Sequence, residues 1–173
     1  MMNVLKQSFG ALSEPWIRIT GMNESDLTNL ILRNADDDPR FVVRLCRGRK
    51  MTTTQGIYDE FAAALQFPYY FGENWPALDE CIADLEWLPA DGYLICITSA
   101  QEIGANDSYD SFATLMRILV KAGRGWAGEN PDLQNFGIAP RPFHVLLQVP
   151  ESRHQTIIER LSSLELNADV FQP

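Results

Sequence analysis

The sequence contains no run of about 20 apolar residues, the length that a helix needs to cross a bilayer. Residues 1–10 also lack a basic start followed by a hydrophobic stretch, the pattern of a secretory signal. No membrane partner is therefore expected, and the sequence favours a cytoplasmic protein. Its 173 residues, 46% hydrophobic and 21% charged, fit one globular domain.

Cysteine and histidine are scarce, with three and two residues. Cys46, Cys81 and Cys96 stand singly in apolar segments, without the paired spacing of a zinc site, and we read them as buried, reduced thiols. A catalytic pair would need one of these thiols beside His144 or His154. His144 lies in an apolar strand and His154 at a helix start, so both are better explained as structural. No metal, cofactor or small-molecule substrate is expected, because no glycine loop that could cradle phosphate is present either.

Cations are in the minority, since 14 Lys and Arg face 23 Asp and Glu and give a formal net charge of -9. Nucleic-acid binders concentrate Lys and Arg, so a nucleic-acid partner is not expected. Arg44, Arg47, Arg49 and Lys50 form a short basic strip, but no stacking aromatics are interleaved with it. We expect this strip to balance the acidic segments. The overall charge favours a basic partner, although acidity also confers solubility.

The hydrophobic patterns predict an α/β fold. Segments rich in β-branched and apolar residues predict strands at 41–46, 93–98 and 143–149. Between them, a helix capped by Thr53 or Thr54 and ended by Pro68, and a second helix at 112–122, carry apolar residues at helical spacing. Strands that alternate with helices predict parallel pairing.

Both ends of the chain predict additional elements. A strand at 15–20 and a helix at 24–33, capped by Asn23, precede the charged segment 35–40, and an amphipathic helix is expected at 154–164. We expect three parts: residues 1–39 as an N-terminal β-α extension packed on the domain, 40–150 as the main domain, and 151–173 as a C-terminal helical extension. The stretch 123–142, rich in Gly, Pro and Asn, is too long for a plain connector and is either flexible or functional.

The most informative segment is FPYYFGENWPALDECIADLEWLP, residues 67–89. Asn74 suits a helix cap and Pro76 suits the first helical turn, so a helix should begin near Trp75. At about 100° per residue, the apolar positions of this helix share one arc, which we expect to face the core. These positions are Trp75, Leu78, Cys81, Ile82 and Leu85.

Glu80 and Asp84 lie on the opposite face of this helix, one turn apart. They repel each other, and no Lys or Arg stands one turn away on the same helix to compensate. Further acids surround the element: Glu73, Asp79 and Glu86. An ordinary solvated face explains this pattern, and so does a site for an external cation. Tyr69 and Tyr70 nearby favour the second reading, because tyrosines beside carboxylates are typical of binding surfaces.

At these residues the sequence resembles the barstar family, small intracellular inhibitors of barnase-type ribonucleases. The shared motif reads FPxYFGxNWxALxxC from Phe67 to Cys81, then DLxWLP from Asp84 to Pro89. The likeness extends more loosely from Phe41 through the third strand. It implies a barstar-like three-stranded parallel sheet with flanking helices. It also implies 1:1 inhibition, in which the loop and the helix enter the active-site groove of a basic ribonuclease.

The resemblance also implies the contact residues. Tyr70 and Asn74 would supply shape and hydrogen bonds, and Glu80 would be the dominant acid that replaces a substrate phosphate. The family usually has Asp at the positions of Pro76 and Glu80, and its acidic contacts from a later helix have no match at 118–122. The expected partner-binding residues are Tyr70, Gly72, Glu73, Asn74, Pro76, Asp79, Glu80 and Asp84.

Two other functions remain open at this stage. A module of the same fold could bind a partner other than a ribonuclease, through the segment 123–142 with its Trp126 and Phe136. Hydrolysis by carboxylates alone, through Glu73 and Glu80, is compatible with their spacing. We nevertheless expect no catalytic residues and no enzyme, and we expect an immunity protein of a toxin-antitoxin pair.

Overall fold

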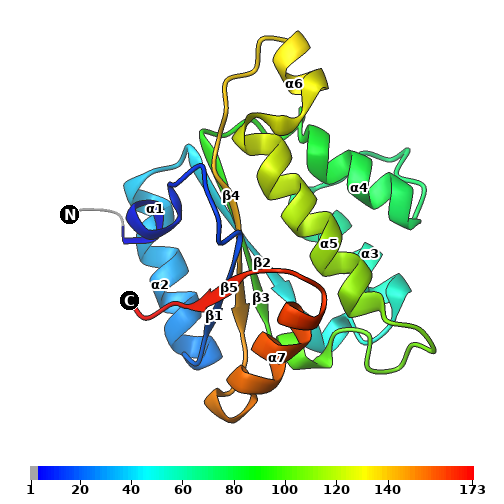
Figure 1. The fold of residues 1–173 in the computed structure, drawn as a ribbon. Coiled ribbons are helices and arrows are strands. Elements are labelled where there is room, and N and C mark those ends of the chain that lie inside the picture. Colours follow the sequence, from blue (N-terminus) through cyan, green and yellow to red (C-terminus); the bar gives the residue numbers. More distant parts are fainter. Residues whose placement is uncertain (1–3) are drawn as a thin grey trace.

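The computed structural model describes residues 4–173, apart from the side chains of residues 35–37. A parallel sheet of five strands lies between two layers of helices (Figure 1). The strand order across the sheet is β2-β3-β4-β1-β5, and every neighbouring pair is parallel. The strands are β1 (Ile17–Thr20), β2 (Phe41–Arg47), β3 (Gly92–Thr98), β4 (Phe143–Gln148) and β5 (Ala168–Val170).

The expectation of three strands is therefore wrong, although the three strands predicted for the main domain lie side by side as β2, β3 and β4. Strand β1 adds to β4, with Ile17 opposite Val145, and β5 adds to β1, with Ile17 opposite Ala168. Both additions come from the terminal extensions. Pairing between segments so distant in the chain leaves no local pattern in the sequence, and β5 is only three residues long.

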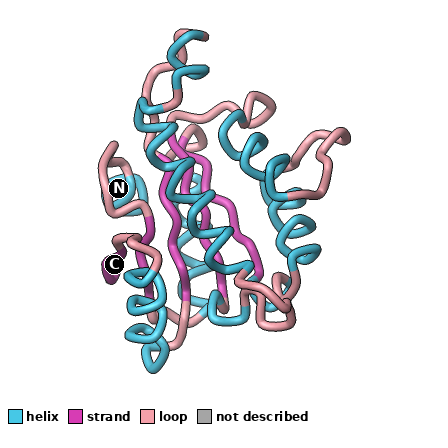
Figure 2. The backbone as a smooth tube through the Cα atoms, turned by 45° about the vertical axis from the view of Figure 1, so that its right-hand side comes forward, coloured by secondary structure: helices cyan, strands magenta, loops and turns pink. Residues whose placement is uncertain are grey.

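Helices cover both faces of the sheet (Figure 2). One face carries α3 (Thr54–Leu65), α4 (Trp75–Asp84), α5 (Ser111–Arg124) and α7 (Glu151–Ser163). The other face carries α1 (Val4–Phe9) and α2 (Glu24–Asp37). The remaining helical segments are η1 (Gly48–Lys50), η2 (Ala100–Glu102), η3 (Gly125–Glu129) and α6 (Pro131–Asn135).

The central strands explain why the sheet forms where it does. Every residue of β3 and β4 is buried, which matches their nearly continuous apolar sequence and the helices on both sides. Strand β2 lies at an edge, and its burial is correspondingly incomplete. On the face of the sheet that it covers, α5 contributes a fully buried apolar stripe: Phe112, Leu115, Met116 and Leu119. Each such side chain stabilises the fold by about 1.5–3 kcal/mol relative to an exposed one.

Most predicted helices are confirmed, with differences at their ends. Asn23 and Thr53 cap α2 and α3, accepting backbone N–H bonds of 2.8 and 3.2 Å. Helix α2 continues past its expected end at Arg33, and α7 begins before His154. Helix α1 was not predicted. No helix within the described residues is both long and apolar enough to cross a membrane.

The stretch 123–142 contains short helical segments up to Asn135 and has no helix or strand from 136 to 142. Helix α5 runs into η3, a wide turn in which Gly128 adopts a φ of 119° that favours glycine, and α6 follows. Asn130 caps α6, which begins at Pro131. The segment thus holds short helical turns, in which η3 continues α5 and α6 projects from that end of the molecule (Figure 1).

Candidate functional site

Helix α4 begins at Trp75, as predicted. The Asn74 side chain accepts a 2.9 Å hydrogen bond from the N–H of Ala77 and donates one of 3.0 Å to the carbonyl of Gly72. A Cβ at position 72 would lie 3.0 Å from the Asn74 amide nitrogen, so glycine keeps this corner open. Pro76 occupies the first turn, where its missing N–H costs nothing. Asn74 therefore fixes the direction in which α4 leaves the loop.

The apolar face of α4 packs on the core, as its spacing predicts. The buried residues of the helix and its C-terminal cap are Leu78, Cys81, Ile82 and Leu85. Trp75 is half-buried and packs edge-on against Tyr58 of α3, with ring centroids 5.3 Å apart. Because one face of the helix is fixed in this way, the opposite face is held toward solvent.

Glu80 and Asp84 are exposed on that opposite face. Within the described part of the chain, neither carboxylate forms an ion pair with a Lys, Arg or His. Burial, followed by the charges of Asp84 and Glu80, raises the pKa of the Cys81 thiol between them. The two acids thus present negative charges that have no ion pair within the described structure.

A notch of about 140 Å³ lies at this face. Its lining brings four of the predicted residues together: Tyr70, Gly72, Glu80 and Asp84. Tyr70 is 65% exposed, and its neighbour Tyr69 is fully exposed. Partial desolvation and the nearby Asp84 carboxylate raise the pKa of Tyr70, so its hydroxyl remains a hydrogen-bond donor at neutral pH. The notch therefore offers one phenol donor beside two carboxylate acceptors.

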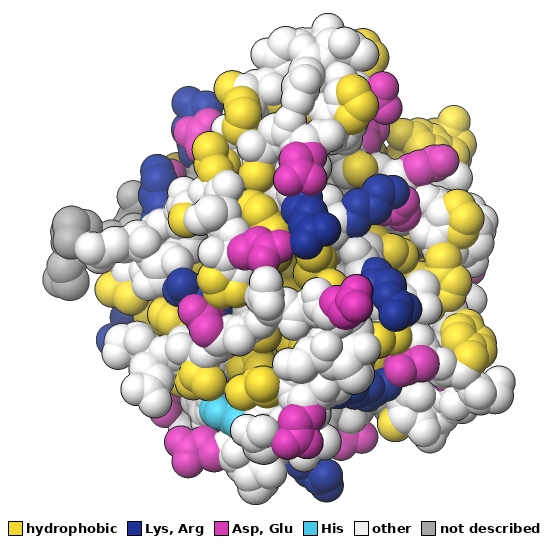
Figure 3. Space-filling view, viewed as in Figure 1, with side chains coloured by type: hydrophobic (Ala, Val, Ile, Leu, Met, Phe, Trp, Pro, Cys, Tyr) yellow, Lys and Arg dark blue, Asp and Glu magenta, His cyan; other side chains and the backbone are white. Residues whose placement is uncertain are grey.

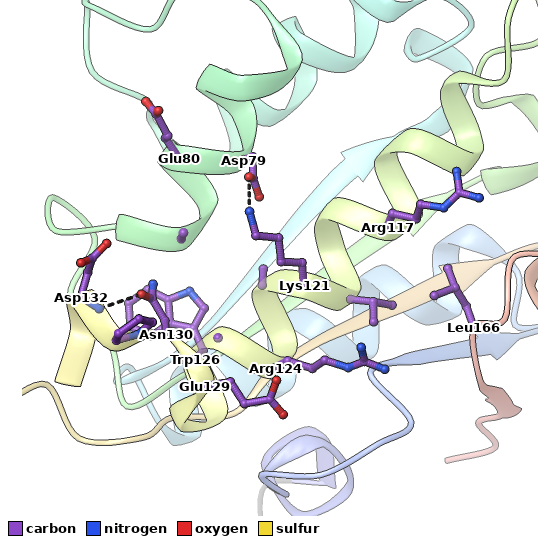
Figure 4. A pocket seen from close by; sticks show the side chains of 15 residues that line it. Asp79, Glu80, Arg117, Lys121, Arg124, Trp126, Glu129, Asn130, Asp132 and Leu166 are labelled. Atoms are coloured by element: carbon purple, nitrogen blue, oxygen red, sulfur yellow. Dashed lines mark hydrogen bonds and ion pairs between the residues drawn. The ribbon is translucent and has the colours of Figure 1, made fainter.

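The other predicted residues lie outside the lining of the notch. Glu73 adopts a left-handed backbone conformation with φ of 47°, and its carboxylate accepts a 2.9 Å hydrogen bond from the Gln55 side chain of α3. Pro76 is exposed at the start of α4. Asp79 points to the other side of the helix, where it forms an ion pair with Lys121 of α5 (Figure 4). Asp79 thus adds less free negative charge than its position in the sequence suggests.

Trp126 of η3 is a residue that sequence reasoning misplaced. It is 2% exposed, so it cannot form part of an exposed docking surface on the segment 123–142, whereas Phe136 is 81% exposed. The Trp126 indole N–H donates a 2.9 Å hydrogen bond to the carbonyl of Ile82. This carbonyl lies in the last turn of α4, where helices leave acceptors without an intrahelical partner. Trp126 therefore ties η3 to the acidic helix.

The thiols and the buried histidine have structural surroundings. Cys46 and Cys96 are free and completely buried, and burial strongly raises the pKa of each thiol. Both ring nitrogens of His144 contact backbone carbonyl oxygens, at 3.2 Å to Pro15 and 2.8 Å to Ala11. The described residues include no group of three or more His, Cys, Asp or Glu that could hold a metal ion.

Two members of the basic strip, Arg47 at the end of β2 and Arg49 just after it, pair with nearby acids. Arg47 donates from its backbone and its guanidinium to Glu60, which is 7% exposed. Arg49 forms an ion pair with Glu24 and donates a 3.1 Å hydrogen bond to Ser99. These pairs join α2, α3 and the strand ends. The sequence predicts that the acids of residues 35–40 and of α4 balance these arginines. The structure pairs Arg47 with Glu60 and Arg49 with Glu24 instead.

Comparison of the fold identifies a similar solved structure. An ORC2 protein of Aeropyrum pernix, solved as ADPNP-ADP complexes, superposes with a TM-score of 0.52 at 10% sequence identity. The match covers 96% of this chain and 44% of that chain, so this chain spans less than half of its length. At this identity the likeness concerns the fold alone. A search of curated proteins finds no match.

The sequence itself gives a more specific match. The family model described as Barstar (barnase inhibitor) matches residues 41–147, from the start of β2 almost to the end of β4. This range includes the loop of residues 68–74, all of α4 and the notch on its exposed face. It also includes α5 and η3, while β1 and β5 lie outside it. The chain belongs to the barstar family.

Proposed function

We propose that this protein inhibits a ribonuclease by placing the exposed face of α4 and the preceding loop in the enzyme's active-site groove. The observation that carries the proposal is the pair of unneutralised carboxylates, Glu80 and Asp84, around a notch that Tyr70 completes. The family supports it, because barstar is described as the barnase inhibitor. Inhibition needs no chemistry from the inhibitor, so no catalytic role is assigned to any residue.

The acidic face of α4 and a ribonuclease groove would be complementary in charge and in hydrogen bonding. A ribonuclease groove binds phosphates and therefore presents Arg, Lys or His side chains. Carboxylates can meet these cations with charge-assisted hydrogen bonds, which are shorter and stronger than neutral ones. The Tyr70 hydroxyl can donate to an acceptor at the groove rim, and Tyr69 adds exposed aromatic area beside it. In this arrangement Glu80 and Asp84 occupy positions that substrate phosphates would take.

Two features alter how the binding energy is distributed. Pro76 supplies no carboxylate where the family usually has Asp, and Asp79 is engaged by Lys121. Glu80 and Asp84 are consequently the acids of α4 that have no ion pair in the described structure. Glu80 is also one methylene longer than the usual Asp, which places its carboxylate further from the helix. Glu80 therefore reaches further into a groove than the usual Asp would.

The biological setting that fits this activity is an immunity protein paired with a ribonuclease toxin. A producing cell would need the inhibitor in its cytoplasm, bound 1:1 to the toxin. The acidic chain, with formal net charge -9, would attract a basic enzyme over long range. Barnase and barstar are themselves the standard example of such steered association, and its rate falls as salt is added.

Titration of RNA cleavage by barnase with this protein tests the proposal. At low ionic strength, wild-type protein should abolish cleavage with a 1:1 endpoint. Glu80→Ala should weaken binding by more than ~2 kcal/mol, or about 30-fold, as expected for a hot-spot acid. The fold should remain intact, because Glu80 is exposed and makes no ion pair within the described structure.

Glu159→Ala provides a matched control, because Glu159 is an exposed acid on α7. The control removes the same charge and should change the affinity by less than about twofold. Equal losses in the two variants would show that only net charge matters. Absence of any inhibition at low salt would instead favour a partner other than a ribonuclease.

A further inference from the structure

Helix α5 presents a row of exposed cations next to the acidic helix. Arg117, Lys121 and Arg124 follow one another at i, i+4 and i+7, so they lie on one side of the helix. Lys and Arg side chains accordingly gather over α5 in the space-filling view (Figure 3). Like charges one turn apart destabilise a helix slightly. Lys121 and Arg124 lie in the last turn of α5, where cations favour the helix dipole, so Arg117 is the cation of this row that the stability of α5 does not explain.

The row forms one wall of a cleft of about 630 Å³. The opposite wall is α4, which contributes Asp79 and Glu80, so the two walls carry opposite charges (Figure 4). The buried Trp126 also lines this cleft, and it ties η3 to α4. The cleft is contiguous with the proposed binding face, because Glu80 lines both the cleft and the notch.

The three cations differ in how they are engaged. Lys121 forms an ion pair with Asp79, and Arg124 forms one with Glu14 of the N-terminal extension. Arg117 is exposed and, among the described residues, forms no hydrogen bond or ion pair. Its guanidinium keeps all of its donors for a carboxylate from outside. The lining of the cleft thus includes one cation that has no hydrogen bond or ion pair in the described structure, although its charge helps to lower the pKa of Asp110.

This arrangement is unfavourable for a partner surface that is cationic throughout. If α4 enters a groove lined by Arg and Lys, α5 brings Arg117 and Lys121 close to the rim of the same groove. Charges of equal sign then repel within about one screening length, ~8 Å at physiological ionic strength. A partner that carries a carboxylate at its rim gains an ion pair at the same place.

We propose that α5 is a specificity element, which selects a ribonuclease with an acidic side chain beside its cationic groove and disfavours ribonucleases that lack one. This inference rests on the proposed function. The acidic side chain of the partner enters the cleft and pairs with Arg117, while Glu80 binds the cationic groove. Specificity of this kind combines an attractive contact with a repulsive one against the wrong partner.

Barnase serves as the probe, and binding is measured by stopped-flow association and by inhibition of RNA cleavage. Barstar-family inhibitors make acidic contacts from this later helix, so the adjoining rim of barnase is expected to be cationic. Arg117→Glu should therefore tighten binding to barnase at least about fivefold at low salt, because a repulsive contact becomes attractive. Arg33→Glu is the control, since it makes the same charge change at an exposed position of α2, on the other face of the sheet. It should change binding less than twofold.

The outcomes separate the two proposals. If wild-type protein binds barnase and Glu80→Ala weakens the complex, but Arg117→Glu has no more effect than Arg33→Glu, the specificity role of α5 is wrong and inhibition stands. Weaker binding of Arg117→Glu than of the wild type would also overturn the specificity role of α5. If neither wild type nor Arg117→Glu binds, both proposals fail. The gain for Arg117→Glu should disappear at high salt.

Discussion

Replacing Trp126 by Phe should destabilise the fold through a single hydrogen bond at the end of α4. The indole N–H donates to the Ile82 carbonyl at 2.9 Å, and the side chain is 2% exposed. Phenylalanine keeps an aromatic ring but leaves this acceptor unpaired, which costs about 1–3 kcal/mol for a buried group. The smaller ring loses roughly 1 kcal/mol of apolar burial. The expected loss is therefore about 2–4 kcal/mol.

Trp16→Phe is the matched control. Trp16 is 5% exposed, and its indole nitrogen is buried without a hydrogen-bond partner within the described structure. The same substitution there removes the same ring atoms together with an unpaired buried N–H, whose removal offsets part of the lost apolar burial, so it should cost less than about 1 kcal/mol. The difference between the two variants reports the bond to Ile82 plus the relief of the unpaired N–H at Trp16.

Urea unfolding followed by far-UV circular dichroism measures both variants. The slope of the free energy against urea concentration should be unchanged, and the midpoint should fall further for Trp126→Phe than for Trp16→Phe. Hydrogen exchange at the last turn of α4 should also become faster in Trp126→Phe. Equal midpoints for the two variants would refute the claim that Trp126 anchors α4.

Two further predictions concern stability. Burial lowers the pKa of His144 below its usual 6.5, so the unfolded state binds more protons. The stability that neutral His144 contributes is complete above its pKa in the unfolded state and is lost as pH falls through its pKa in the folded state. The urea midpoint should therefore drop between pH 7.5 and pH 5.5. An unchanged midpoint would contradict this. Gln66 ends α3 with a φ of 54°, so Gln66→Gly should raise the free energy of unfolding by about 0.5–1 kcal/mol. Ala63→Gly within the same helix should lower it by about as much. Calorimetry that shows both variants destabilised would argue against strain at Gln66.

The sequence allowed the main elements of the fold to be predicted where local patterns are strong. Strands β3 and β4 are continuous apolar segments, and α4 begins where Asn74 and Pro76 require it. Strand β5 could not be predicted, because three residues carry little pattern and their partner β1 lies about 150 residues away in the chain. Non-local pairing is decided by packing of the whole sheet.

In the candidate site, too, features set by local patterns could be predicted and features set by packing between helices could not. The alternation of apolar and acidic residues along α4 placed Glu80 and Asp84 on the exposed face. The ion pair of Asp79 with Lys121 depends on how α5 lies beside α4, which no spacing within one helix reveals. The Gly-rich neighbours of Trp126 predict a flexible or functional segment. Its burial depends on tertiary contacts, with the Tyr93 ring at a centroid distance of 5.1 Å and with the Ile82 carbonyl of α4.

Hydrogen exchange of this protein with and without barnase tests the central claim most directly. If the exposed face of α4 enters the active-site groove, amides from Tyr69 to Glu86 should exchange more slowly in the complex, and an oligonucleotide that fills the groove should abolish this protection. Protection confined to residues 131–142 or to α1 and α2, or none at all, would contradict the account.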